Sequence, residues 1–279
     1  MSNNVSPSNK YYDRHVLFLK ANELTKKESD SYKDAWGCGL EVLECAIRYK
    51  TEIDEKTIVL VNPAEKKIIY LPYRTRFDKN YGKRIARKWG KIGYTEGVFL
   101  TLTLNPRPFK SLHEAYEALM WGLNLFITAV RKEYPNFIGY ARVVEFQENG
   151  NPHLHILIFG VDFIPEEWIR KLWEEKYQLG TQLKIKRIDN QKGAIRYLIK
   201  YLLKAFSGKN SEEAKKADKQ KALLWALNSR GWAVSRSLVS LISDRPIQTK
   251  SSGFWVYLGA YPVEVVGLSY FEFVVYIRT

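Results

Sequence analysis

Residues 150–160 read GNPHLHILIFG, an apolar run that holds two of the four histidines of the chain. Side chains of an extended strand alternate between its two faces, so His153 and His155 share one face and Leu154, Ile156 and Ile158 share the other. The apolar side must be buried, which leaves the two imidazoles on the opposite side. This stretch therefore predicts a strand that packs on a core and presents a histidine pair to a ligand.

The neighbouring segments carry further secondary-structure signals. The run FIGYARVVEFQ (137–147) is rich in β-formers, and the loop ENGNP between the two runs predicts an antiparallel hairpin. Ser111 and Glu114 form a capping-box pattern at the start of a helical apolar repeat. The remaining expected elements are a strand over 98–104, helices over 111–132, 165–177 and 193–206, and a strand over 181–188.

The order β-α-β-β-α-β, followed by one more helix, predicts an α+β fold of the split βαβ type. We expect an antiparallel sheet with helices on one face, and the histidine pair on the other, open face. The chain is expected to divide into a basic N-terminal region (1–92), a core (93–206) and a C-terminal region (207–279). A hairpin is predicted over 57–73, and strands around a turn are predicted over 254–277.

Composition narrows the function classes. The formal charge is +14, and basic residues gather with aromatic ones over 73–91 and 183–204, a combination that is typical of nucleic-acid binding. Pro262, Glu264 and Glu272 interrupt the apolar C-terminal segment, so no membrane span is expected. The first ten residues are polar, which predicts no secretory signal and a cytoplasmic protein. Cys38 and Cys45 are too few for a zinc or disulfide framework.

Two imidazoles alone would hold a divalent ion weakly, so a third ligand is expected on the adjacent strand of the hairpin. Glu145 and Gln147 are the candidates, because they share a face that the antiparallel pairing brings beside the histidines. We favour Glu145, since a carboxylate with two neutral imidazoles binds a divalent ion and leaves coordination positions for a substrate oxygen.

The predicted helix over 193–206 contains YLIKYLLK (197–204), in which Tyr197 and Tyr201 are four residues apart, as are Lys200 and Lys204. Each pair therefore stacks one turn above the other. A phenol has a pKa near 10 and is a poor nucleophile unless a cation or a metal stabilises its anion. The lysines are placed to do this, although an ordinary amphipathic helix would show the same spacing.

Three segments taken in order, FLTLTLNP (99–106), NPHLHILIFG (151–160) and YLIKYLLK (197–204), resemble the motifs of the rolling-circle replication initiators of the HUH endonuclease superfamily. The resemblance covers about residues 98–206, with a possible tail at 230–237, and leaves the first 90 residues unexplained. In relaxases, the sister group, the tyrosine lies ahead of the histidines, whereas here it follows them.

The resemblance implies a Mn²⁺- or Mg²⁺-dependent nickase of single-stranded DNA that forms a 5′-phosphotyrosine and a free 3′-OH. It ranks Tyr201 first and Tyr197 second as nucleophile. The residues that it implies for the site are the metal ligands His153, His155 and Glu145, the two tyrosines, and Lys200 and Lys204 as partners of phosphate or phenolate.

The expected partners are single-stranded DNA at a replication origin, duplex origin DNA bound by the N-terminal basic region, and a host helicase and polymerase. A separate helicase is expected because the chain contains no G-x-x-x-x-G-K-[ST] phosphate loop. A related HUH transposase or relaxase is the nearest alternative. A mononuclear iron oxygenase would have no use for the lysine-rich tyrosine helix. A non-catalytic module on an RRM-like sheet would place aromatics where the histidines stand.

Overall fold

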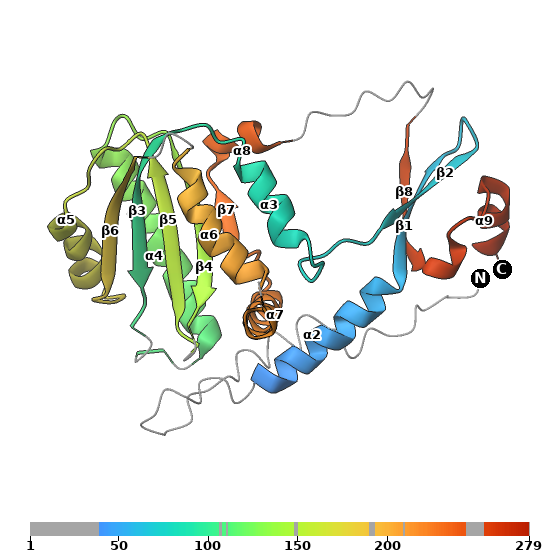
Figure 1. Cartoon of the computed structure of the whole chain (residues 1–279), viewed down its shortest axis with the longest axis horizontal. Helices are drawn as coiled ribbons and strands as arrows, with labels where there is room; N and C mark the ends of the chain where they lie inside the picture. The colour runs from blue at the N-terminus through green and yellow to red at the C-terminus, as the bar shows by residue number, and fades with distance from the viewer. Residues whose placement is uncertain are drawn as a thin grey trace. The chain divides into compact units, whose positions relative to one another are not determined.

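The computed structural model describes residues 39–105, 108–109, 111–147, 150–189, 193–208, 210–243 and 254–278 (Figure 1). The polar N-terminal tail, Cys38, the side chain of Cys45, and Glu148 and Asn149 of the predicted hairpin loop lie outside the described parts. The described chain forms two compact units. Residues 79–243 make up most of the larger unit, and residues 45–78 together with 254–278 make up the smaller one.

A five-stranded sheet forms the centre of the larger unit, and all its neighbouring strands are antiparallel. The strand order is β6-β3-β5-β4-β7. The strands are β3 (Glu96–Thr103), β4 (Gly139–Phe146), β5 (Pro152–Phe159), β6 (Leu183–Asp189) and β7 (Trp232–Val234). The predicted hairpin over 137–160 and the strands over 98–104 and 181–188 are confirmed.

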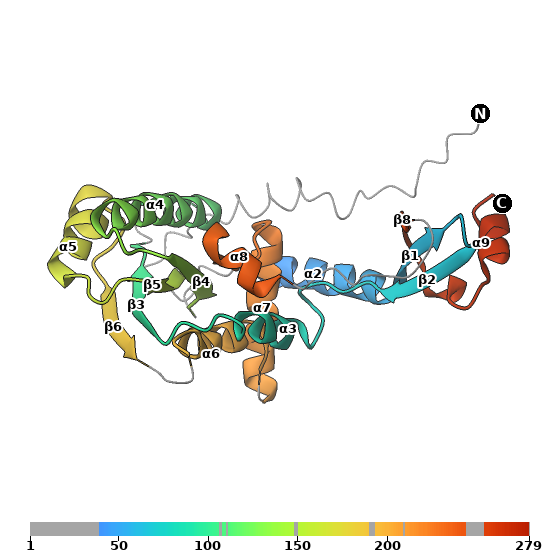
Figure 2. The same ribbon diagram turned by 90° about the horizontal axis from the view of Figure 1, so that it is seen from above.

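Helices lie on both sides of this sheet, as Figure 2 shows, with α4 on one side and α3 and α6 on the other. The predicted cap of α4 is confirmed, since the Ser111 side chain accepts a hydrogen bond from the Glu114 backbone N–H. The predicted helix over 165–177 forms as a short α-helix that continues into a π-helix. The bounds are α3 (Tyr81–Trp89), α4 (Leu112–Glu133), α5 (Glu166–Arg170), η2 (Lys171–Lys176), α6 (Ile195–Phe206), α7 (Ser211–Ala226) and α8 (Arg236–Ile242).

The α+β class and the antiparallel sheet are confirmed, but the histidine face is not bare. On that face Phe99, Val143 and Leu157 alternate with the polar residues, and all three are buried. Apolar side chains of this size require cover, and α6 supplies it by packing on β4 and β5. Only the end of the face near His153 therefore borders a pocket.

Sequence segments from both ends of the chain build the smaller unit. The predicted hairpin over 57–73 forms as β1 (Lys56–Asn62) and β2 (Lys67–Pro72), and β8 (Val256–Pro262) pairs with the other edge of β1. Its core contains Val59, Val61, Val265 and Phe273. The remaining elements are α2 (Gly39–Asp54), η3 (Val263–Val265) and α9 (Tyr270–Tyr276).

This division differs from the three consecutive regions that we expected. β1 and β8 are nearly 200 residues apart in sequence, yet neither end of the chain could bury its apolar strand face alone. Residues 79–92 depart from the expected N-terminal region in the opposite direction, because Ile85 and Trp89 of α3 are buried in the core of the larger unit.

The prediction of strands throughout 254–277 is wrong for its second half. Residues 270–276 form α9, whose start is fixed by a capping box in which Ser269 and Glu272 bond each other's backbone N–H groups. This local hydrogen bonding outweighs the strand preference of the valines and aromatics that follow. Within the described parts of the chain, no helix is both long enough and apolar enough to cross a bilayer.

Candidate active site on the histidine face

The strand register brings the sequence-predicted residues of β4 and β5 together. Glu145 is directly opposite His153 in the β4–β5 pairing, and Thr101 of β3 is directly opposite His155. Leu154, Ile156 and Ile158 are fully buried on the other side of β5, as their alternation with the histidines predicts. Gln147 lies just beyond the end of β4, where its backbone N–H bonds the Asn151 carbonyl.

The ring of His155 is held at both nitrogens. Its Nε2 lies 3.0 Å from Glu145 Oε2, and its Nδ1 lies 3.0 Å from Thr101 Oγ1. The residue is only 4% exposed. Two in-plane hydrogen bonds on a buried ring fix the direction in which Nε2 points, which is a requirement for a preorganised ligand.

His153 is the less constrained member of the pair. Its Nε2 is buried and has no hydrogen-bond partner among the described residues. Burial, and then the neighbouring His155, lowers the pKa of His153 to about 4, which outweighs the opposite effect of Glu145. The ring is therefore neutral at physiological pH, the state in which an imidazole nitrogen can bind a metal.

Glu145 connects the strands to α6. Its Oε1 lies 2.5 Å from Lys204 Nζ, while its Oε2 faces His155. Burial raises the pKa of this carboxyl, but hydrogen bonds from His155 and Lys204 lower it more, and the resulting pKa is about 2. The carboxylate is therefore charged at neutral pH.

These three side chains are not assembled around a common point. Among the described residues, no group of three or more His, Cys, Asp or Glu side chains is arranged to hold a metal ion. The donor set nevertheless suits a divalent ion, because two imidazoles and a carboxylate lie on one face and the buried His153 Nε2 lacks a partner. Binding would require His155 Nε2 to exchange its contact with Glu145.

Both tyrosines of α6 reach the histidine face. The Tyr201 ring stacks on the His155 ring, with centroids 3.9 Å apart, and the Tyr197 ring meets the edge of Phe99, with centroids 4.8 Å apart. Burial, the hydrogen bond to Tyr197, and the charges of Tyr197 and Glu145 raise the pKa of Tyr201 to about 12. The Tyr201 phenol is therefore protonated in this arrangement.

The two predicted lysines take different positions. Lys200 Nζ lies 5.1 Å from the centroid of the Tyr197 ring, and Lys186 of β6 approaches the same ring, with its Nζ 5.2 Å from the centroid. Lys204 instead pairs with the carboxylate of Glu145. In this arrangement the cations near the phenols therefore surround Tyr197 rather than Tyr201.

A pocket of about 1230 Å³ opens beside these residues. It contains His153, His155, Glu145 and Tyr201, and its rim is cationic. The lysines that line it are Lys184, Lys204, Lys216 and Lys219. A strongly charged strand such as single-stranded nucleic acid matches a concave surface of this kind.

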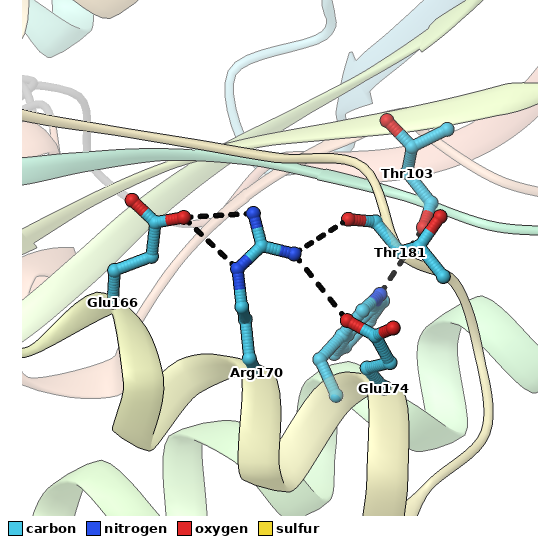
Figure 3. Close-up of polar contacts among 6 residues, drawn as sticks. Thr103, Glu166, Arg170, Glu174 and Thr181 are labelled. Atoms are coloured by element: carbon cyan, nitrogen blue, oxygen red, sulfur yellow. Dashed lines mark hydrogen bonds and ion pairs between the residues drawn. The ribbon is translucent and has the colours of Figure 1, made fainter.

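The wall of the pocket at α5 has a different character (Figure 3). Arg170 donates to Glu166 Oε1, to Glu174 Oε2 and to the backbone carbonyl of Thr181. These bonds tie α5 and η2 to the segment that leads into β6. Trp173 Nε1 donates to the carbonyl of Thr103, which anchors the same wall to β3. Two carboxylates offset the charge of Arg170, so the lysines supply the positive charge of the pocket.

Several site residues were not predicted as such. Thr101 and Thr103 alternate with apolar residues in FLTLTLNP, and Lys184 and Lys186 alternate in TQLKIKRI, so the same period-two reasoning could have placed all four on the histidine face. α7 was not predicted as an element, although it brings Lys216 and Lys219 to the pocket. Its signal is the N-cap Asn210, which bonds the backbone N–H of Glu213.

Comparison with known proteins agrees with the resemblance of the motifs. Residues 97–206 match a family described as replication-associated protein, of the ORF2 type. "Uncharacterized protein 1" of Halorubrum pleomorphic virus 1 is 28% identical over 147 residues, a match that covers 46% of this chain and 29% of the viral protein. No solved structure matches the chain.

The match extends from β3 to the end of α6 and so includes all seven residues that the sequence assigned to the site. It supports a role in replication. The segment formed by residues 97–206 therefore belongs to the ORF2-type replication-associated protein family.

Proposed function

We propose that this protein is a rolling-circle replication initiator that nicks and rejoins single-stranded DNA through a tyrosine. The observation that carries the proposal is the stacking of Tyr201 on His155 inside a lysine-rimmed pocket that also holds His153 and Glu145. A nucleophile, a candidate ligand set and a polyanion-binding rim thus occur at one place, within the segment that matches the replication-associated family.

The metal ligands in this proposal are His153, His155 and Glu145. When bound there, Mn²⁺ or Mg²⁺ supplies Lewis-acid neutralisation of charge on the non-bridging oxygens of the scissile phosphate. The low pKa values of His153 and Glu145 favour this use, since the imidazole is neutral and the carboxylate is charged near pH 7. Neither group has to lose a proton before it can act as a ligand.

In the cleavage step, the oxygen of Tyr201 attacks the phosphorus in line with the bond to the 3′ oxygen. The new P–O bond makes a 5′-phosphotyrosine, the old P–O bond breaks, the phenol gives up its proton and the 3′ oxygen gains one. Because one phosphodiester replaces another, attack by the 3′-OH can reverse the step and rejoin the ends without ATP. Tyr197, one turn away, is placed for a second cleavage.

The high pKa of Tyr201 means that its phenol must be activated when substrate binds. Lys204 can contribute, because a Glu145 engaged as a metal ligand would leave the ammonium group to a phosphate or a phenolate. Lys200 lies beside Tyr197 and would serve the second tyrosine in the same way. These roles give both lysines of YLIKYLLK a function in strand transfer.

The DNA strand is proposed to enter along the lysine rim of the pocket. Lys184 of β6 stands on one flank, and Lys216 and Lys219 of α7 stand with Lys204 on the other. Duplex origin DNA is proposed to meet the basic segment over 73–91, in which Lys83 and Arg87 of α3 are exposed. Strand separation and synthesis are assigned to a host helicase and polymerase, since the sequence lacks a phosphate loop.

The decisive experiment incubates the protein with single-stranded DNA from its replicon's origin and Mn²⁺, and then separates products on a denaturing gel. A protein–DNA adduct that resists denaturation and disappears with EDTA is expected. DNA binding without an adduct, at any Mn²⁺ or Mg²⁺ concentration, would instead indicate a non-catalytic nucleic-acid-binding module. Comparison of linear and nicked origin substrates then distinguishes an initiator from a related transposase or relaxase.

A further inference from the structure

Thr101 makes the second hydrogen bond of the His155 ring, and no role in the proposed reaction has yet been assigned to it. Its Oγ1 lies 3.0 Å from His155 Nδ1, and both side chains are buried. The bond crosses from β3 to β5 at a directly paired position. A buried hydroxyl bonded to the ring of a candidate metal ligand is the usual location of a residue that orients the ligand.

The direction of this bond follows from the other side of the ring. Glu145 is a charged carboxylate and can only accept, so His155 Nε2 must carry the hydrogen that it donates to Oε2. In a neutral imidazole the opposite nitrogen then has a lone pair and no hydrogen. In this arrangement Thr101 therefore donates its hydroxyl hydrogen to Nδ1.

The requirement reverses when Nε2 serves as a metal ligand. Nε2 must then offer its lone pair, so a neutral ring carries its hydrogen on Nδ1, and this buried N–H needs an acceptor. The ring loses one proton at Nε2 and gains one at Nδ1, so its charge does not change. A hydroxyl can donate in the first state and accept in the second by rotating about its own C–O bond.

We propose that Thr101 is a positioning residue whose hydroxyl reverses its hydrogen-bond direction, so that His155 Nε2 can exchange Glu145 for a divalent cation while the ring stays in place. The inference rests on the proposed metal-dependent function and adds to it the group that allows the exchange. A carboxylate or carbonyl at position 101 could accept but not donate, and an alkyl group could do neither.

The surroundings of the ring explain why such a partner is needed. Tyr201 lies on one face of the His155 ring, and Phe99 is stacked nearly parallel to it, with an interplanar angle of 16°. Thr101 and Glu145 hold the two edges. A ring packed in this way cannot exchange its nitrogens by turning over without displacing Tyr201, so the change of tautomer must be met by the partner of Nδ1.

The test compares Thr101→Val, which keeps the β-branched shape but removes the hydroxyl, with Thr101→Ser, which keeps the hydroxyl. Thr103→Val is the matched control, because Thr103 lies on the same face of the same strand but is paired opposite His153. Mn²⁺ binding is measured by calorimetry on the full chain. Thr101→Val should weaken binding about tenfold or more, whereas Thr101→Ser should stay within about threefold of wild type, as loss or retention of an outer-shell partner implies.

A second readout follows the proton itself. ¹⁵N–¹H correlation spectra of the imidazoles should show His155 with its hydrogen on Nε2 in the metal-free protein and on Nδ1 after titration with diamagnetic Mg²⁺. Folding of each variant is checked by circular dichroism and thermal unfolding. Thr103→Val should show the wild-type change of tautomer.

Two results would overturn the inference while leaving the proposed function intact. One is Mn²⁺ binding by Thr101→Val as tight as that of the wild-type protein, and the other is a metal-free His155 that already carries its hydrogen on Nδ1. A wild-type protein that binds neither Mn²⁺ nor Mg²⁺ at millimolar concentration would instead refute the proposed metal site and the inference with it.

Discussion

The ring of Tyr201 rests on the ring of His155, with centroids 3.9 Å apart and planes inclined by 30°. The candidate nucleophile and a candidate metal ligand are thus parts of one aromatic stack, which Phe99 extends. Any displacement of the imidazole is transmitted to the phenol. The order in which cleavage requires ligand exchange and phenol activation therefore has a structural basis, and the two events can be tested separately.

Removal of the Tyr201 hydroxyl should abolish the first cleavage without disturbing the stack. In Tyr201→Phe, the rate of adduct formation on single-stranded origin DNA should fall by at least about 10³-fold, the scale on which loss of a nucleophile is felt. Tyr197→Phe should retain the adduct, because its ring keeps the contact with Phe99. Quantitative denaturing gels measure both rates. An adduct that persists in the double variant would show that α6 does not supply the nucleophile.

Period-two reasoning predicted the strands and the shared face of His153, His155 and Glu145, because register between strands joined by a short loop follows from local sequence. It did not predict that α6 would cover the upper part of that face, although the burial of Phe99 and Leu157 requires such cover. The same alternation would have assigned Thr101 to the site. Lys204 was placed near the phenols by helical spacing alone, whereas its contact with Glu145 depends on how α6 crosses β4.

Long-range pairing sets a further limit on what the sequence can predict. Nothing local in VYLGAYP (256–262) indicates that it pairs with TIVLVN (57–62) rather than with a neighbour in sequence. The helix at 270–276 was predictable, since Ser269 and Glu272 have the capping-box spacing. There the strand propensity of valines and aromatics was given too much weight against a terminal hydrogen-bond pattern.

Stability should fall between pH 6.5 and 4.5 because of His153. The pKa of this residue in the folded protein is about 4, below its ordinary value of 6.5, so the unfolded chain binds more protons across this window. The free energy of unfolding therefore decreases as the pH is lowered, by less than about 1.4 kcal/mol per pH unit, the limit for one proton. Glu145, with a pKa of about 2 against 4.5, contributes to the same trend only below pH 4.5.

Urea unfolding of metal-free protein at pH 7.0, 6.0 and 5.0, followed by circular dichroism, measures this dependence. His153→Gln should flatten it, since the variant has no titrating group at that position. An equally steep dependence in wild type and variant would mean that His153 is protonated in the folded state, and so is not poised as a neutral ligand.

The lysine rim should determine the salt dependence of DNA binding. Each phosphate neutralised on a single strand contributes about 0.7 to the slope of log affinity against log salt. Lys184→Gln combined with Lys216→Gln should therefore reduce the slope by about 1.4 and weaken binding at low salt. Fluorescence anisotropy of a labelled oligonucleotide in EDTA measures this without cleavage.

The double variant Lys171→Gln with Lys176→Gln is the matched control for charge. These lysines line a separate depression on η2 and should leave the slope within about 0.3 of wild type. If both double variants change the slope equally, the DNA is attracted by the overall charge of the protein and not by the rim of the pocket.

Lys204 provides a test of which cation Glu145 is arranged to bind. Its ammonium group occupies Oε1 of the carboxylate that the proposed metal site requires, so the two cations compete. The lysine is 67% exposed, and an ion pair of that kind is worth only about 0.2–1 kcal/mol. Lys204→Gln should therefore tighten Mn²⁺ binding by roughly threefold and at the same time lower the rate of adduct formation, because it removes a cation that would face the phosphate or phenolate. Calorimetry and the adduct assay on the same preparation separate the two effects. Weaker Mn²⁺ binding in this variant would mean that Lys204 holds Glu145 in the orientation of a ligand, and the lysine would then be a positioning residue for the metal instead of a partner of the transferred strand.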